Sequence, residues 1–176
     1  MEFLLILVAN VACVFTLIAV HEAGHYLAGW AGGIPRREMR VRLLAFPQHV
    51  VLRDGDAWVP PFDLERYVGL MRRHLTSAPR LFLYTAGGLL METVFTTVAV
   101  LAAKSAGWPG VALMIAGQSL CLFAIYVLVM DLPMALRRGY PWGDVSGLWF
   151  IARGPTALLV TALLLVRGLL LWYVLA

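Results

Sequence analysis

The residues best suited to chemistry in this chain are five consecutive ones, HEAGH, which run from His21 to His25. Residues at positions i and i+4 of a helix lie on one face, so the two histidines can present their imidazoles to one metal ion. Zinc bound by two histidines and a third protein ligand keeps a position for water and lowers the pKa of that water to about 7. Glu22, which follows the first histidine, is then placed to accept the water's proton as a general base.

The segment before the motif indicates that the motif lies in a membrane. Residues 3–20 form an apolar run of 18 residues without a charged side chain. Ionisable groups that continue a membrane helix cost about 2.5–3.5 kcal/mol each on insertion scales, and they usually mark a functional site. The alternative is a pair of interfacial histidines that neighbouring groups satisfy, with a glutamate that faces lipid headgroups. The position of the motif favours a zinc site over this alternative.

Zinc requires a third protein ligand, and two later aspartates have suitable chemistry. Asp144 follows Pro-Trp-Gly, which can form an irregular turn, and precedes residues 145–151, which can begin a helix. Asp131 ends the third apolar run. There it could ligate the metal, cap or orient the following loop, or accept a hydrogen bond from the other ring nitrogen of a ligating histidine. The residues themselves leave both aspartates as candidates.

These segments together resemble the site-2 protease family of intramembrane zinc metalloproteases. HEAGH matches the His-Glu-x-x-His of that family's first membrane helix without exception. Residues 131–147, DLPMALRRGYPWGDVSG, loosely match its Asn-Leu-x-Pro and Asp-Gly elements, with Asp131 at the start of the first and Asp144 in the second. Residues 88–92, GLLME, match its Gly-Pro-x-x-Asn more weakly and put Glu92 at the asparagine position.

The resemblance implies a minimal core of a zinc-dependent endopeptidase that cleaves a membrane-protein substrate within or near the membrane. It points to one zinc ion held by His21, His25 and Asp144, with Glu22 as the catalytic base and Glu92 as a candidate contact to the substrate backbone. The loosened second and third motifs motivate a rival hypothesis. In that hypothesis the chain is a non-proteolytic membrane subunit that keeps the fold and binds a partner protein.

Composition predicts an integral membrane protein that is mainly α-helical. Of the 176 residues, 61% are hydrophobic and only 14% are charged, which leaves room for about four helices of about 20 residues. We expect a single domain, 1–176, with membrane helices at about 3–32, 81–103, 110–130 and 155–176 and a polar interlude at 34–80. Cys13 and Cys121 both lie in apolar runs, so we expect neither a disulfide framework nor a cysteine zinc site.

The polar interlude carries two local patterns. Apolar and charged residues alternate over residues 38–43, which is the period of a half-buried strand, and Asp54-Gly55 predicts a tight β-hairpin with a type I′ turn. The resemblance also implies small strands here, and an open strand edge could pair with an unwound substrate segment; a plain membrane-surface hairpin is equally compatible. From residue 63 the pattern becomes that of a basic amphipathic helix lying among the headgroups.

Charge distribution predicts the orientation of the chain in the bilayer. Nine arginines lie between the first two predicted helices and three lie between the last two, whereas the other side has only Lys104 and the termini. Membrane topology explains this clustering better than nucleic-acid binding does, and it places both arginine-rich loops on the cytoplasmic side. We therefore expect a multi-pass protein of a bacterial cytoplasmic membrane, with the two histidines and Asp144 meeting near the cytoplasmic face.

Three polar residues lie inside the predicted membrane helices. Asn10 shares the histidine face, where a hydrogen bond to another helix is the expected role. Glu92 and Arg167 lie at matching depths, roughly 16–18 Å from the cytoplasmic ends of their helices at 1.5 Å per residue. We expect a buried ion pair, although Glu92 could instead contact substrate or stay protonated and Arg167 could extend toward the headgroups.

Overall fold

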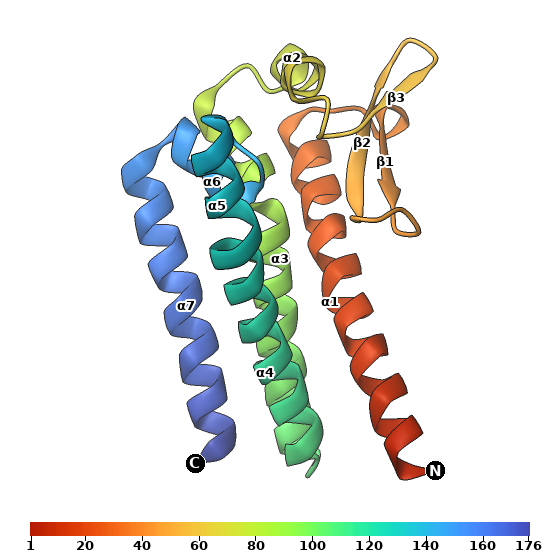
Figure 1. Ribbon diagram of the computed structural model, residues 1–176, viewed down its shortest axis with the longest axis vertical. Coiled ribbons are helices and arrows are strands. Elements are labelled where there is room, and N and C mark those ends of the chain that lie inside the picture. The colour runs from red at the N-terminus through yellow and green to blue at the C-terminus, as the bar shows by residue number, and fades with distance from the viewer.

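The computed structural model describes residues 1–176 and contains four helical spans that are long and apolar enough to cross a membrane, as expected for a multi-pass membrane protein. The spans are α1 (Glu2–Gly32), α3 (Ala78–Ser105), a composite of α4 (Pro109–Ile125), η2 (Tyr126–Asp131) and α5 (Leu132–Arg138), and α7 (Arg153–Leu175). Helix α3 contacts each of the other three spans. Both chain termini lie at one end of the bundle (Figure 1).

The opposite end of the bundle carries the residues between α1 and α3, which we call the cap (residues 34–77). The cap contains η1 (Arg36–Glu38), β1 (Met39–Arg42), β2 (His49–Asp54), β3 (Ala57–Val59) and α2 (Leu64–His74). The end of α5 and the short helix α6 (Asp144–Ile151) lie at this same end (Figure 1). The two arginine-rich loops therefore share one side of the bundle, which is the arrangement that the charge distribution predicts.

The cap sheet is larger than the expected hairpin. Its three strands are antiparallel in the order β1-β2-β3, and Leu52 of β2 pairs with Met39 on one side and Val59 on the other. The predicted alternation is confirmed in β1, whose apolar residues face inward. The predicted type I′ turn is wrong: Asp54 pairs with Ala57, so the loop is Gly55-Asp56, and φ is positive only at Gly55. Glycine at the first loop position fits a type II′ turn.

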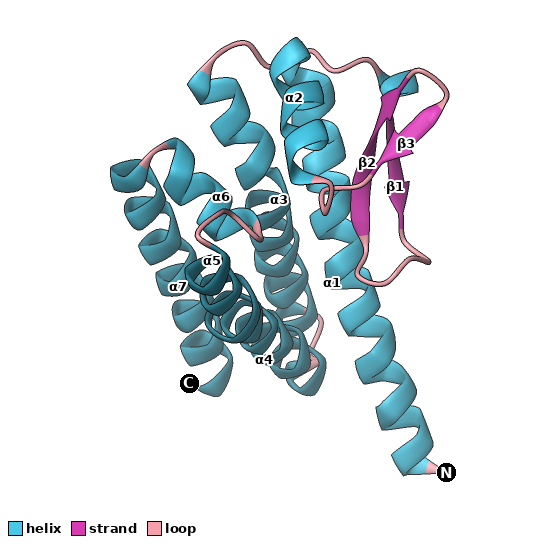
Figure 2. Ribbon diagram, turned by 45° about the horizontal axis from the view of Figure 1, so that its top comes forward, coloured by secondary structure: helices cyan, strands magenta, loops and turns pink.

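Helix α2 is amphipathic as expected, but its apolar face is covered by protein. Tyr67 and Leu70 are buried in a cluster with apolar residues of the sheet and of the ends of α1 and α3. Figure 2 shows α2 lying across this end of the bundle beside the sheet. An amphipathic pattern cannot tell whether the apolar face meets lipid or a neighbouring sheet, and here it meets the sheet.

The third span runs past its predicted end because the chain passes Pro133 without leaving the helix. Proline cannot donate a backbone hydrogen bond and its ring crowds the carbonyl of residue i−4. The helix adapts with wider π-helical turns over Tyr126–Asp131 and then continues as α5 to Arg138. Residues five apart lie near one face of such a turn, which brings Tyr126 and Asp131 together.

Glycine allows α1 and α3 to cross closely beside the histidine motif. A Cβ atom on Gly87 of α3 would lie 2.7 Å from the Cβ of Ala28 and 2.7 Å from the carbonyl oxygen of Gly24, within the motif. Further along, Gln118 of α4 donates a 2.5 Å hydrogen bond to Asn10 of α1. The interhelical role expected for Asn10 is thereby confirmed.

Candidate metal centre

His21, His25 and Asp144 come together where α1, α3 and α6 meet. The Nε2 atom of His21 lies 2.9 Å from Oδ2 of Asp144, the Nε2 atom of His25 lies 3.3 Å from the same oxygen, and the two Nε2 atoms are 3.1 Å apart. These are three donor atoms of the types that zinc prefers. Asp144, more than 100 positions away in sequence, thus joins the two histidines in one cluster.

The three ligand atoms are close enough together to share one metal ion. Zinc–nitrogen and zinc–oxygen bonds of about 2.0–2.2 Å would place neighbouring ligand atoms of a tetrahedron about 3.3–3.6 Å apart, slightly more than the separations of 2.9–3.3 Å found here. Gly88 of α3 keeps the centre of the cluster open. A Cβ on Gly88 would lie 2.5 Å from Nε2 of His25 and 2.6 Å from Nε2 of His21.

The hydrogen bonding of His25 orients its ring for a ligand role. Its Nδ1 lies 2.9 Å from the backbone carbonyl oxygen of Tyr84, which can only accept a hydrogen bond. Nδ1 therefore carries a proton, and Nε2 is the ring nitrogen that faces the Asp144 carboxylate and His21. A hydrogen bond at the other ring nitrogen is the usual support of a metal-ligating histidine.

The short helix α6 presents Asp144 to the histidines. Its preceding residue, Gly143, has no side chain to cap the helix, and Asp131 supplies the missing acceptor. The Asp131 carboxylate accepts hydrogen bonds from the backbone N–H groups of Gly143 (3.0 Å) and Ser146 (2.9 Å). The geometry therefore groups Asp144, and not Asp131, with the histidines, and Asp131 holds the loop that carries the ligand.

Two further features fix Asp144 in place. The hydroxyl of Tyr126, from the π-helical turn, accepts a 2.9 Å hydrogen bond from the Asp144 backbone N–H. A Cβ on Gly143 would lie 2.9 Å from Cγ of Asp131, so only glycine fits at that position. Burial opposes ionisation of the Asp144 carboxyl, but His25 and His21 outweigh it and hold its pKa below the ordinary range.

Glu22 lies inside the same region and is 8% exposed. It is adjacent in sequence to His21, and the backbone amide of Val50 in β2 lies beside its carboxylate. The carboxylate is therefore next to the cluster without being one of the three grouped ligand atoms. This is the position that a general base beside a metal requires.

Glu92 and Arg167 form a buried ion pair in the bundle. One terminal nitrogen of the Arg167 guanidinium lies 3.2 Å from Oε1 of Glu92, and the two side chains are 0% and 9% exposed. Ser119 of α4 donates a 2.9 Å hydrogen bond to the same oxygen. The arginine thus points into the bundle, not toward the headgroups.

Several of these residues could not be assigned a role from the sequence. Tyr84 acts through its backbone carbonyl, which leaves no signal in its side chain. The part played by Tyr126 depends on the π-helical turn, for which Pro133 is the one available clue. Gly88 lies in the segment that resembles the family's second motif, but its value as empty space is visible only in the structure.

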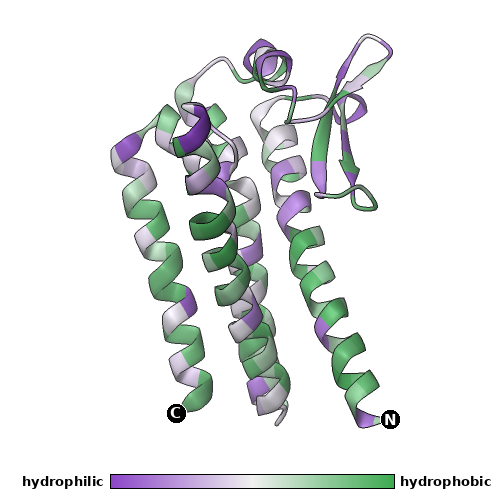
Figure 3. Ribbon diagram, viewed as in Figure 1, coloured by the Kyte–Doolittle hydropathy of each residue, from purple (hydrophilic) through white to green (hydrophobic).

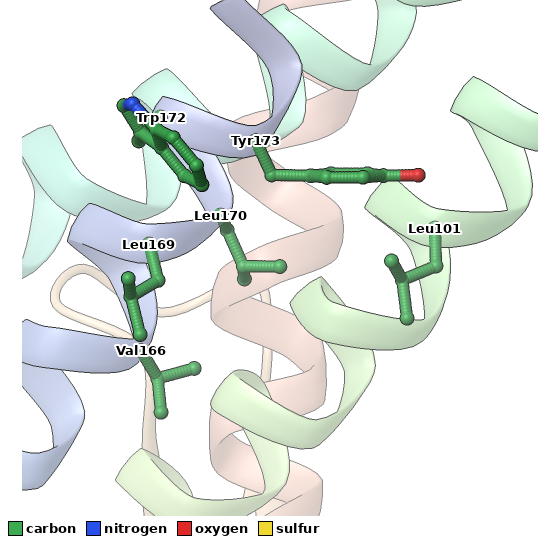
Figure 4. A pocket seen from close by; sticks show the side chains of 6 residues that line it. All are labelled: Leu101, Val166, Leu169, Leu170, Trp172 and Tyr173. Carbon is green, nitrogen blue, oxygen red and sulfur yellow. The ribbon is translucent and has the colours of Figure 1, made fainter. Parts of the chain in front are cut away.

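The hollows on the bundle surface have a different character from this cluster. One lies between α3 and α7 and is lined by Leu101, Val166, Leu169, Leu170, Trp172 and Tyr173 (Figure 4). All six are hydrophobic, and no cluster of metal-ligating side chains lies there. The possible metal-ligating group lies instead at the cap end of α1.

Comparison with protein-family models, with curated proteins and with solved structures found no match to this chain. The metal centre described above therefore rests on the residues and their geometry.

Proposed function

We propose that this chain is a zinc-dependent endopeptidase that cleaves a membrane-protein substrate within or near the bilayer. The observation that carries the proposal is the convergence of His21, His25 and Asp144, with Glu22 buried beside them, at one end of a four-span bundle. The resemblance of HEAGH and of the later aspartate segment to site-2 proteases supports the same assignment.

A bound zinc ion would supply a Lewis acid for the scissile carbonyl and would make a water molecule acidic near neutral pH. His21, His25 and Asp144 are the residues that would hold it. Glu22 accepts the proton of the attacking water as its oxygen bonds to the carbonyl carbon, and then delivers that proton to the amine nitrogen as the carbon–nitrogen bond breaks.

The surroundings of Glu22 limit the access of bulk water to its carboxylate. The cap covers this end of the bundle, and Val50 of β2 lies next to the carboxylate. The sheet also has edge strands, β1 and β3, each paired on one side only. We propose that an unwound substrate segment adds to such an edge, since a peptide bond in a helix cannot be attacked. The arginine-rich loops favour the cytoplasmic side for this end.

Metal analysis of the purified protein tests the site. Each of His21→Ala, His25→Ala and Asp144→Ala is expected to reduce bound zinc from one ion per chain, because each removes a ligand. Glu22→Gln is the matched control, since it is expected to keep zinc while turnover falls by about 10²–10⁴-fold. Full zinc in Asp144→Ala together with loss of zinc in Asp131→Ala would contradict the ligand assignment.

Substrate trapping with Glu22→Gln tests the reaction. We expect the variant to retain a membrane protein that the wild-type chain cleaves and the variant does not. A protein that is retained equally by both and cut by neither would contradict the protease assignment.

That outcome would support the second candidate, a non-proteolytic membrane subunit that binds a partner protein. One observation favours it. Glu92 stands where the family has an asparagine, and Oε1 of its carboxylate is engaged by Arg167 and Ser119 instead of by a substrate backbone. A metal-free chain that co-purifies with a fixed partner is the result expected for this candidate.

A further inference from the structure

Glu92 lies behind His21, on the side of the imidazole ring away from Asp144. Its Oε2 atom is 3.7 Å from Nδ1 of His21, about 0.5 Å beyond the usual range of an N–H···O hydrogen bond. No other polar group contacts this Nδ1, and no other polar group contacts Oε2, because the partners of Glu92 all meet Oε1. Each of these two atoms therefore has the other as its polar neighbour.

The two histidines are supported in parallel ways by the same helix. Tyr84 of α3 offers its backbone carbonyl oxygen to Nδ1 of His25, and Glu92, two turns further along α3, offers a carboxylate oxygen to Nδ1 of His21. A metal-ligating histidine donates its other ring N–H to such an acceptor, which fixes the tautomer and the orientation of the ring. Helix α3 thus provides one acceptor for each histidine.

The carboxylate of Glu92 is itself contacted from two other helices, α4 and α7. Arg167 of α7 pairs with Oε1, and its Nε donates a 3.1 Å hydrogen bond to Ser119 of α4. Another nitrogen of the guanidinium donates a 2.8 Å hydrogen bond to Thr93 of α3, and the group lies 4.6 Å from the ring centroid of Phe123. These contacts orient the guanidinium, whose remaining terminal nitrogen faces the carboxylate as an ion-pair partner.

We infer that Glu92 is a positioning residue for His21, and that Arg167 fixes Glu92 from α7. The orientation of one metal ligand on α1 then depends on the packing of all four spans. This inference rests on the metal centre proposed above but not on protease activity. In this inference Glu92 supports the ring of His21, and this role replaces the substrate contact considered for Glu92 above.

Two double variants that differ at a single position isolate this role. Glu92→Gln/Arg167→Met and Glu92→Leu/Arg167→Met both remove the buried charges together, so both are expected to fold. The first keeps an oxygen acceptor behind His21, and the second leaves none. Zinc affinity of the full chain in detergent, measured by competition with a chromophoric chelator, is expected to be about 10–100-fold weaker in the leucine variant. The visible spectrum of bound cobalt should shift only in that variant.

Thr156→Val controls for a buried change outside the network. The Thr156 hydroxyl donates only to the backbone carbonyl of Ala152, so its loss should leave zinc affinity at the wild-type value. Equal zinc affinities and equal cobalt spectra in the two double variants would overturn the inference.

Should the leucine variant fail to fold, Glu92→Asp provides the same test with the charge retained. Its shorter side chain keeps the negative charge near Arg167 but withdraws the oxygen from His21, so zinc affinity is expected to fall about 10-fold. An unchanged affinity in Glu92→Asp would overturn the inference. A wild-type chain that binds no zinc would instead overturn the metal centre itself, so the two failures are distinguishable.

Discussion

The cap and the bundle place their charged groups in opposite positions. The cap buries an apolar cluster and carries its ion pairs on the surface, where Asp54 meets Arg66 and Arg73. The bundle also buries apolar clusters, but its ion pair lies inside: Arg167 is 1% exposed, whereas Leu158 on the outside of α7 is 74% exposed. Figure 3 shows the contrast, with purple on the outer parts of the cap and green over most of the four spans.

This difference reflects the surrounding solvent, which is water for the cap and lipid for the bundle. Water solvates charges and expels apolar groups, so the cap folds around residues such as Leu52 and Val59. Lipid solvates leucine as well as a protein core does, so in the bundle it is the polar groups that must find partners within the protein. Buried polar groups therefore link the helices in addition to the apolar clusters, and they also build the candidate site.

The largest effect is expected from filling the space at the centre of the site. Gly88→Ala places a Cβ within 2.6 Å of both histidine Nε2 atoms, where it displaces the rings or the ion. We expect bound zinc to fall from one ion per chain to near zero, as measured by metal analysis. Gly117→Ala in α4 is the matched control, because a Cβ there meets nothing within 4 Å. Normal zinc content in Gly88→Ala would contradict the placement of the site.

A large effect on stability is expected from the buried ion pair. Arg167→Met and Glu92→Gln each leave an uncompensated charge or an unpaired group in the bundle, and each is expected to cost about 3–5 kcal/mol. The double variant should be less damaged than the sum of the single variants, as measured by unfolding in detergent. Strictly additive losses would show that the two side chains do not interact.

Much of this bundle interior could be predicted from the sequence because spacing carries the information. The i, i+4 pattern puts His21 and His25 on one face, and an even number of crossings returns Asp144 to the same end of the bundle. The equal depths of Glu92 and Arg167 follow from counting residues along two helices. Ion pairing in the bundle then follows from the cost of an unpaired charge in lipid.

The remaining features depend on contacts that leave no pattern in the sequence. The amphipathic pattern of α2 is the same whether its apolar face contacts lipid or the sheet. The choice of Asp144 over Asp131 depends on how the π-helical turn places Tyr126 and on which carboxylate caps α6. The carbonyl of Tyr84 could belong to any residue type, because every residue has one.

A moderate effect is expected where the cap joins the bundle. The hydroxyl of Tyr67 donates a 3.0 Å hydrogen bond to the Val50 carbonyl and lies 2.6 Å from the hydroxyl of Tyr84. Burial beside Tyr84 raises the pKa of Tyr67 well above its ordinary range, so the group stays neutral. Tyr67→Phe leaves the Val50 carbonyl without this donor and the Tyr84 hydroxyl without an acceptor, and is expected to cost about 1–3 kcal/mol.

Hydrogen exchange of the β2 amides, together with thermal unfolding, measures this change. Tyr140→Phe is the matched control, because that hydroxyl is near the surface and contacts only Arg138. Zinc content should remain normal in both variants. Equal exchange rates in the two variants would contradict a role for Tyr67 in holding the cap.

The smallest effect is expected from the surface charges of the cap. Arg66 and Arg73 hold the pKa of Asp54 below its ordinary value of 3.8, although burial acts slightly in the opposite direction. Because the folded-state pKa is lowered, the stabilisation is present above pH 3.8 and is lost as the pH falls through the folded-state value. Such exposed pairs contribute little and are screened by salt. Asp54→Asn should therefore raise the exchange rate of the β2–β3 amides only slightly at pH 6 in low salt, and not at all in high salt. An effect as large in high salt would mean that Asp54 holds the turn through hydrogen bonds, and the contrast between a charged surface in the cap and a charged interior in the bundle would need another basis.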